Sequence, residues 1–374
     1  MSPLFNIPFF GIDRMFKEHS AEIMDCVSSV YKSGKVLMGP EVDEFEVQLA
    51  SLCQRKYAIS VGSCTDALYF SLLCSGIRPG DEIIVTSFSF IASVSPILRI
   101  GAIPVFTDTD PSSCQMNIHD IENKITSKTK AILGVHLFGA MLDIEKLEAI
   151  AKKHKLILIE DAAQSLGAGI SNRKAGSMGD ISCLSFDPTK IIGAFGNGGM
   201  VLTDNPDFFD QLKKLRYHGK SVKGNDFEIL GFNSRIATSQ ASIMLYELKQ
   251  LKNWIDKRNK VARFYLDHLK NNLQIILPEY PQSGIHCFHK FVIKCDKRNE
   301  LKGYLENKGI QTMIHYPKAL FEYELFKQYP FKAENISHTH ELKTKVLSLP
   351  VYPELSENEI DYICKSIIEF TEQC

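Results

Sequence analysis

The chain has 374 residues, of which 44% are hydrophobic, and its formal net charge is −1. This length indicates two domains, or one large domain with a smaller satellite, around a substantial interior. The balanced charge excludes a basic nucleic-acid footprint, and no apolar run is long enough to indicate a membrane span.

The first residues, MSPLFNIP, do not read as a secretory signal, because no basic segment precedes an apolar one. Ten cysteines are scattered along the chain without a CxxC pair, mostly in apolar stretches. We therefore expect reduced, buried thiols in a cytoplasmic protein. The cysteine spacing does not suit a zinc site, and no metal is expected.

Up to about residue 270, short apolar runs typical of buried strands alternate with helical patterns. Helices are predicted at Thr65–Cys74 and Ile144–Lys155, among others, from apolar residues at helical spacing. The alternation indicates an α/β fold with a mostly parallel sheet flanked by helices. The predicted strands are Tyr57–Val61, Glu82–Thr86, Pro104–Phe106, Ala131–His136, Leu156–Glu160, Ile181–Phe186 and Gly199–Thr203.

The pattern changes after a long predicted helix, Ala237–Leu269, that reads as a connector. We expect a large domain over residues 1–250, including an N-terminal helical segment, and a small C-terminal α+β domain over residues 251–374. The elements predicted for the small domain are a strand at Cys287–Cys295, a helix at Arg298–Lys308, a strand at Thr312–His315 and a helix at Glu357–Phe370.

Three segments place polar groups at the carboxyl ends of predicted strands, where open α/β sheets bind ligands. Asp161 ends one strand, and Lys190 follows another in a loop that becomes rich in glycine. After a third strand, a turn of small residues opens a helix, where Ser63 or Thr65 can act as the cap and free N–H groups can bind phosphate. Taken singly, each segment also has an ordinary structural explanation.

Together, the three segments supply what pyridoxal phosphate (PLP) requires: a lysine for a Schiff base, a carboxylate against the pyridine nitrogen, and a phosphate cup. A carboxylate about 4 Å from the nitrogen, at an effective dielectric constant near 20, contributes about 4 kcal/mol. That corresponds to roughly three pK units in favour of a protonated ring. Nucleotide motifs do not fit, because GAFGNGG at residues 193–199 is neither a P-loop nor GxGxxG and precedes a strand.

Further motifs occur in a consistent order along nearly the whole chain. With them, the chain resembles the DegT/StrS-type sugar aminotransferases, which have the aspartate-aminotransferase fold (type I of the PLP-dependent transferases). The motifs are MGPEVDEFE at 38–46, CTDAL at 64–68, IEDAAQ at 159–164, SFDPTK at 185–190, GFNSR at 231–235, HYP at 315–317 and LSLP at 347–350.

The resemblance implies a role for each matching position. Lys190 would hold PLP as an aldimine, Asp161 would pair with the pyridine nitrogen, and Gln164 would lie near the ring hydroxyl. For several of the remaining positions, a purely structural role in the core or in a turn stays open. The remaining implied roles are Thr65, the backbone of Asp66 and Ser185 at the phosphate, Phe90 stacked on the ring, Asn233 at the phosphate of a neighbouring subunit in a homodimer, and His315 and Tyr316 on the sugar-nucleotide side.

By the same resemblance, the chain is an aminotransferase working through a pyridoxamine phosphate intermediate. L-glutamate would be the donor, and a 3-keto or 4-keto deoxysugar on dTDP, UDP or GDP the acceptor. The product would serve polysaccharide, lipopolysaccharide or glycoside synthesis. The chain departs from the family pattern at Cys64, Asp187, Asn197 and Lys318–Phe321. The last segment is expected to face the substrate, so the sugar remains open.

Three alternatives remain at this point. A related PLP sugar dehydratase is disfavoured. That branch of the family looks like it has histidine in place of the lysine, whereas this chain keeps Lys190. A non-catalytic regulator on the same fold is possible because fold does not determine function. An aminotransferase acting on a free cyclitol or small ketone is the third.

Overall fold

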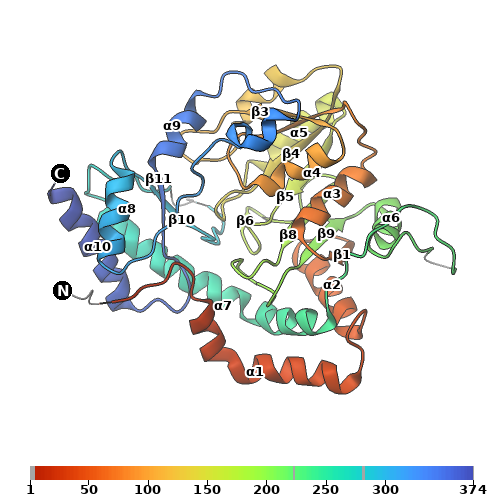
Figure 1. Cartoon of the computed structure of the whole chain (residues 1–374), viewed down its shortest axis with the longest axis horizontal. Coiled ribbons are helices and arrows are strands. Elements are labelled where there is room, and N and C mark those ends of the chain that lie inside the picture. The colour runs from red at the N-terminus through yellow and green to blue at the C-terminus, as the bar shows by residue number, and fades with distance from the viewer. Residues whose placement is uncertain (1–4, 222–223, 280–282, 374) are drawn as a thin grey trace.

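The computed structural model describes residues 5–221, 224–279 and 283–373. Its centre is a seven-stranded sheet in the order β1-β9-β8-β5-β4-β2-β3 (Figure 1). Six of the seven strands run in the same direction, and β9 is antiparallel to its neighbours β8 and β1, which confirms the mostly parallel sheet. The strands are β1 (Tyr57–Val61), β2 (Glu82–Thr86), β3 (Ile103–Thr107), β4 (Thr129–Val135), β5 (Ile157–Asp161), β8 (Ile181–Ser185) and β9 (Gly199–Thr203).

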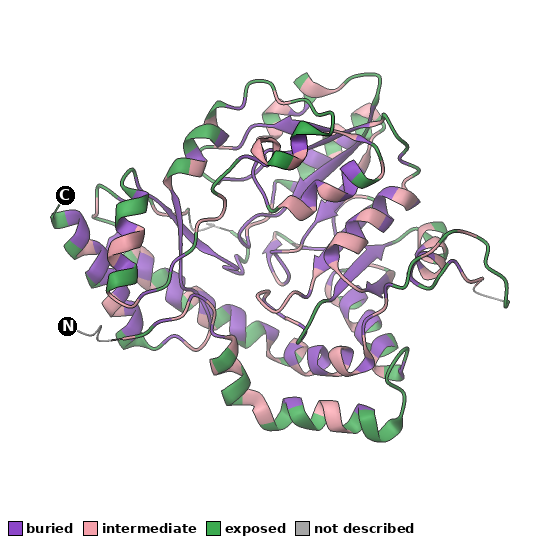
Figure 2. Ribbon diagram, in the orientation of Figure 1, coloured by how far each residue is buried: buried purple, intermediate pink, exposed green. Residues whose placement is uncertain are grey.

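Helices cover both faces of this sheet, and Figure 2 shows its strands buried between them. Successive strand residues point to opposite faces, so Ile83 and Val85 join one apolar core while Ile84 joins another. The first face packs against α3 (Cys64–Cys74), α4 (Ser95–Arg99) and α6 (Pro206–Arg216); the second packs against α2 (Pro40–Leu52), α5 (Ile144–His154) and the first half of α7 (Thr238–Leu269).

A separate apolar core forms around the C-terminal part of the chain. It contains the antiparallel pair β10 (Phe291–Lys294) and β11 (Val346–Leu349), with α8 (Arg298–Asn307) and α10 (Glu357–Glu372). The remaining elements are α1 (Ile12–Ser33), α9 (Ser337–Lys345), the short pair β6 (Gly169–Ile170) and β7 (Arg173–Lys174), and 3₁₀ turns at Ile91–Ser93, Ile118–Asp120, Glu122–Lys124, Leu320–Glu322 and Glu324–Lys327.

Helix α7 joins the two regions without a break (Figure 1). Residues up to Ile255 pack in a core of the large sheet, and residues from Val261 onward pack in the C-terminal core. A domain boundary at residues 250 and 251 stays a prediction, and it falls inside this helix. None of the helices in the described ranges has the length and apolarity to cross a membrane.

Two strand predictions in the C-terminal region were wrong in part or in full. Only Phe291–Lys294 of the predicted strand Cys287–Cys295 is extended, because Phe288 takes a left-handed backbone with φ of 42°. Thr312–His315 is not a strand: Met313 makes a single bridge to Ser348 of β11. Cys374 and Met1–Leu4 lie outside the described residues, and the nine described cysteines form no disulfide.

The register of the sheet brings the predicted ligand segments to one edge. Asp161 pairs with Cys183 of β8, so Ser185 lies two residues further along the neighbouring strand. Gly199, at the start of β9, pairs with both Ser185 and Val61. The ends of β1, β5 and β8 therefore meet at the start of β9.

Helix α7 holds the loop that follows Lys190. The carboxylate Oε2 of Glu247 accepts the N–H of Gly193 at 3.0 Å. The Glu247 side chain is fully buried, and its Oε1 has no hydrogen-bond partner among the described residues. Burial raises the pKa of Glu247 to about 8, while the bond from Gly193 opposes the shift.

Gly199→Ala is expected to destabilise the protein. A methyl group at this position would lie 2.3 Å from the carbonyl carbon of Ser63, so the turn before α3 would have to move. Overpacking of this kind typically costs about 1–3 kcal/mol. Urea unfolding of the variant measures the loss.

Gly303→Ala is the matched control. No heavy atom lies within 4 Å of the added methyl group, and the residue lies inside α8. Alanine should be neutral or stabilise the helix by up to about 1 kcal/mol. Equal losses in the two variants would contradict the role given to the close approach at Gly199.

Glu247→Gln is expected to stabilise the protein more at pH 8 than at pH 5. Above its ordinary pKa of 4.5 the residue ionises in the unfolded chain, whereas the folded protein keeps it protonated up to about pH 8. The contribution of Glu247 to the free energy of unfolding of the wild type is therefore fully present below pH 4.5. It falls as the pH rises towards 8, at about 1.4 kcal/mol per pK unit. Glutamine still accepts from Gly193 and does not ionise.

Chemical denaturation at the two pH values tests this expectation. Glu145→Gln, at an exposed position on α5, provides a control that removes one carboxylate without the burial. Its stability relative to the wild type should change little between pH 5 and pH 8. The prediction is wrong if Glu247→Gln behaves in the same way as this control.

Candidate active site

A cavity of about 580 Å³ lies at the sheet edge where these strands end. Lys190, Asp161 and the turn that opens α3 all contribute to its wall. The structure thus brings together the three segments that the sequence pointed to. The predicted residues that line the cavity are Thr65, Phe90, Asp161, Gln164, Ser185, Lys190, His315 and Tyr316.

Lys190 follows β8 through a tight turn. Its N–H donates to the carbonyl of Asp187 at 2.9 Å, and the Asp187 carboxylate accepts the Thr189 N–H, also at 2.9 Å. Among the described residues, the Lys190 ammonium has no hydrogen-bond partner in the structure. Burial lowers its pKa, against the raising effects of Asp187, Cys64 and Asp161. The amine therefore reaches its neutral, nucleophilic form more easily than an exposed lysine.

Asp161 is held in place by two neutral donors. Ser93 donates its hydroxyl to Oδ2 at 2.8 Å, and the Ala163 N–H donates to Oδ1 at 3.1 Å. The side chain is 4% exposed, and burial raises its pKa while these bonds and Lys190 oppose the rise. A buried carboxylate with lone pairs to spare is suited to a cationic N–H partner.

Gln164 connects Asp161's strand to the C-terminal region. Its Oε1 accepts the Phe138 N–H at 2.9 Å, and its Nε2 donates to the Tyr316 hydroxyl at 3.1 Å. His289 Nδ1 lies 3.3 Å from the same Oε1, and its Nε2 has no partner among the described residues. Gln164 thereby fixes Tyr316 and His289 at the cavity wall.

The turn before α3 is capped by Ser63, whose Oγ accepts the Asp66 N–H at 3.1 Å. Asp66 is not part of the cavity wall, and its carboxylate accepts from Ser234 at 2.7 Å. Its backbone N–H is therefore already bonded, unlike the free donor that the sequence suggested. Thr65 and Cys64 line the cavity, and Cys64 is also packed in the apolar core.

Three aromatic or imidazole groups form the opposite wall. Phe90 is 57% exposed, with its ring centroid 6.4 Å from that of Tyr316. His315 Nδ1 lies 2.9 Å from the Ser348 hydroxyl. Burial first, then Lys290 and Lys190, lower the pKa of His315 to about 3, so it is neutral in this setting.

Asn233 lies apart from the cavity on an exposed loop, where its Oδ1 accepts from Arg235 at 2.8 Å. The segment Lys318–Phe321 was expected to face the substrate, and for Ala319 and Leu320 this was wrong. Both are fully buried, and Phe321 packs on Phe106, because these three apolar residues fill the core beside β3. None of these four residues lines the cavity.

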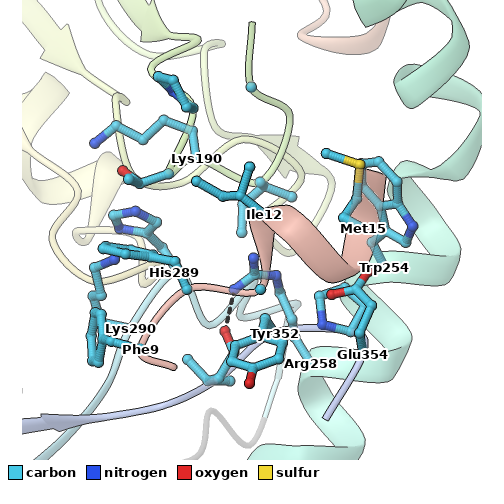
Figure 3. Close-up of a pocket in the computed structure, with 18 of the residues that line it drawn as sticks. Phe9, Ile12, Met15, Lys190, Trp254, Arg258, His289, Lys290, Tyr352 and Glu354 are labelled. Atoms are coloured by element: carbon cyan, nitrogen blue, oxygen red, sulfur yellow. Dashed lines mark hydrogen bonds between the residues drawn. The ribbon is translucent and has the colours of Figure 1, made fainter. Parts of the chain in front are cut away.

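Sequence reasoning missed several residues of the site. Ser93 lies three residues after Phe90, within the same SFSFIAS run, so its spacing on a 3₁₀ turn was a usable signal. His289 and Lys290 gave none, because they sit in a stretch that reads as a core strand. Figure 3 shows both beside Lys190 in an adjoining pocket. The structure shows no group of metal-ligating side chains in the residues it describes.

Comparison with known proteins agrees with this geometry. The family model described as the DegT/DnrJ/EryC1/StrS aminotransferase family matches residues 17–368. The chain is 38% identical to a UDP-N-acetyl-3-dehydro-alpha-D-glucosamine 3-aminotransferase of Acidithiobacillus ferrooxidans, covering 96% of this chain and 97% of the relative. It is 35% identical to a pleiotropic regulatory protein of Geobacillus stearothermophilus, over 98% of both chains.

A solved structure is similar over the whole length. The crystal structure of S. venezuelae DesV in complex with a ketimine intermediate superimposes with a TM-score of 0.95 and 32% identity, covering all of both chains. The fold of the chain is therefore that of the PLP-dependent aminotransferases, as the sequence predicted.

Proposed function

The chain belongs to the DegT/DnrJ/EryC1/StrS aminotransferase family, and from this premise we propose that it transfers an amino group from L-glutamate to the keto group of a nucleotide-linked deoxysugar. It is a PLP-dependent sugar aminotransferase. The observation that carries the proposal is that Lys190 and the buried Asp161 face one cavity.

The residues of the cavity fit PLP. Asp161 is buried and accepts only from neutral donors, so it can take the N–H of a protonated ring nitrogen. The Lys190 amine has no hydrogen-bond partner among the described residues, and its pKa is lowered, as a covalent attachment point requires. The positions proposed to hold the cofactor are Lys190, Asp161, Gln164 at the ring hydroxyl, Phe90 on the ring face, and Thr65 and Ser185 at the phosphate. The backbone N–H of Asp66 is left out of this set because it already donates to Ser63.

Bound PLP supplies an electron sink for the carbon that loses a proton. The proton itself would be moved by Lys190, because burial lowers the pKa of its amine and makes the neutral, basic form easier to reach. Asp161 would stabilise positive charge on the ring nitrogen, because a cation beside a buried carboxylate favours the ionised form of that carboxylate. Ser93 holds the Asp161 carboxylate in a single orientation.

His315 and Tyr316 are proposed to contact the acceptor sugar. Both line the cavity, and Tyr316 is fixed by its bond from Gln164. Because burial keeps His315 neutral, it can donate to or accept from sugar hydroxyls without bringing a charge. Tyr323 lines the same wall, beyond the segment in which the chain departs from the family pattern.

A homodimer with sites at the subunit interface is part of the proposal. Large apolar side chains are exposed on α1 and on the loop after α6, among them Tyr31, Phe227 and Leu230, and the last is 95% exposed. Exposed apolar patches of this kind mark protein interfaces. Asn233 lies on the same loop, next to Ser234, which bonds Asp66, and is proposed to reach the phosphate site of a second copy. We place the enzyme in the cytoplasm, serving polysaccharide or lipopolysaccharide synthesis.

The purified protein should aminate at least one member of a panel of nucleotide-linked 3-keto and 4-keto sugars. Mass spectrometry of the products with and without L-glutamate measures the reaction. Lys190→Ala should abolish amination and the covalent attachment of PLP that borohydride reduction makes permanent. Retention of that attachment in the variant would show that another residue carries the cofactor.

Asp161→Asn should retain some PLP and lose turnover by several orders of magnitude. The amide is neutral, so about three pK units of support for the protonated ring nitrogen disappear, while the volume stays the same. Steady-state kinetics, with PLP content measured on the same samples, separate lost chemistry from lost binding. Turnover at the wild-type rate would refute the electrostatic role of Asp161.

A further inference from the structure

Lys290 is a second buried lysine beside Lys190. It directly precedes β10, and its N–H donates to the carbonyl of Phe138 at 3.1 Å. Its side chain is 5% exposed and runs between Phe9 and Phe10, with Nζ 5.1 and 4.3 Å from their ring centroids. Lys290 and Lys190 line the same two cavities, and Figure 3 draws His289 between them.

The Lys290 ammonium has no hydrogen bond and no ion pair within the described part of the chain. Its charged neighbours are mostly basic: Lys190 and Arg258 both act to lower its pKa, after burial, and Asp187 is the acid that opposes them. Asp187 Oδ1 is already occupied by Thr189. His289 and His315 also lie near Lys290 and carry no negative charge, while Glu247 and Glu354 line the adjoining pocket without an ion pair to Lys290.

Burying a charged amine without a counter-ion is unfavourable unless an anion binds to it. The two aromatic faces compensate part of the lost hydration through cation–π contacts. The flexible end of the side chain is not enclosed on all sides, since it forms part of the wall of the cavity that Lys190 also lines. The arrangement is that of a preformed anion site.

On the basis of the proposed function, we propose that Lys290 binds the carboxylate of the amino donor. In an amino acid, the carboxylate is attached to the same carbon that carries the reacting nitrogen. The group that binds it must therefore lie close to Lys190, as Lys290 does. Phe9 and Phe10 hold the lysine so that the donor carbon is presented to the Lys190 amine.

The diphosphate of a nucleotide sugar is the other anion that the reaction brings in. It is separated from the keto carbon by several bonds, so the group that binds it need not lie close to Lys190. A single lysine buried at 5% exposure suits one compact, desolvated carboxylate better. Lys290 is therefore assigned to the carboxylate of the amino donor.

Glutarate tests this binding because it carries the carboxylates of the donor and has no amine that reacts. Isothermal titration of the PLP-loaded protein should show glutarate binding that Lys290→Met weakens roughly 10- to 100-fold, the range for one charged hydrogen bond.

Stability measurements distinguish this role from a structural one. Methionine fills a similar volume without a buried charge, so Lys290→Met should unfold at a higher temperature than the wild type when no ligand is present. Lys294→Met, at the last residue of β10, is the matched control. Lys294 Nζ donates to the carbonyl of Pro111 at 2.6 Å and does not line the cavity of Lys190, so this variant should lose stability and keep glutarate binding.

Unchanged glutarate affinity in Lys290→Met would overturn the inference. A variant that keeps glutarate affinity and loses affinity for UDP or dTDP would also overturn it, and would assign Lys290 to the diphosphate. Failure of the proposed function looks different. The wild type would bind glutarate, and L-glutamate would bleach its PLP absorbance band, but the protein would aminate no keto-sugar in the panel.

Discussion

The site depends on the register between four strands of the central sheet. Asp161, Ser185 and the turn after β1 stand at their positions because β5, β8, β9 and β1 pair in one fixed alignment. A shift of one residue would turn each side chain to the opposite face. The close approach of Gly199 to the turn at Ser63 completes this alignment, because any side chain at residue 199 would collide with backbone.

Burial then determines the charge states of the groups that the register brings together. The same desolvation lowers the pKa of Lys190 and raises that of Asp161. A lysine that is easily neutral can attack and move protons, and a carboxylate held by Ser93 can face a cation. The excess of basic groups around Lys290, with Lys190 and Arg258 among them, favours anionic substrates at that wall of the cavity.

Local sequence patterns predicted the elements of the large sheet closely. β1, β2 and β9 have the predicted bounds, and the others differ by one or two residues at an end, because their apolar runs are long and bounded by polar turns. The C-terminal region was harder to predict. There the strand near Cys287 is cut short by the left-handed Phe288, and Thr312–His315 makes a single bridge, so local hydrophobicity did not report the pairing partner.

The sequence by itself determined the α/β class and the lysine, the acid and the helix start that suit PLP, because each follows directly from a strand end. The tertiary structure decided which other residues join them. Ser93 reaches Asp161 across 68 positions, and His289 reaches Gln164 across 125. The tertiary structure also buries Ala319 and Leu320 in the core rather than placing them at the cavity. Contacts between distant segments depend on packing, which no local pattern encodes.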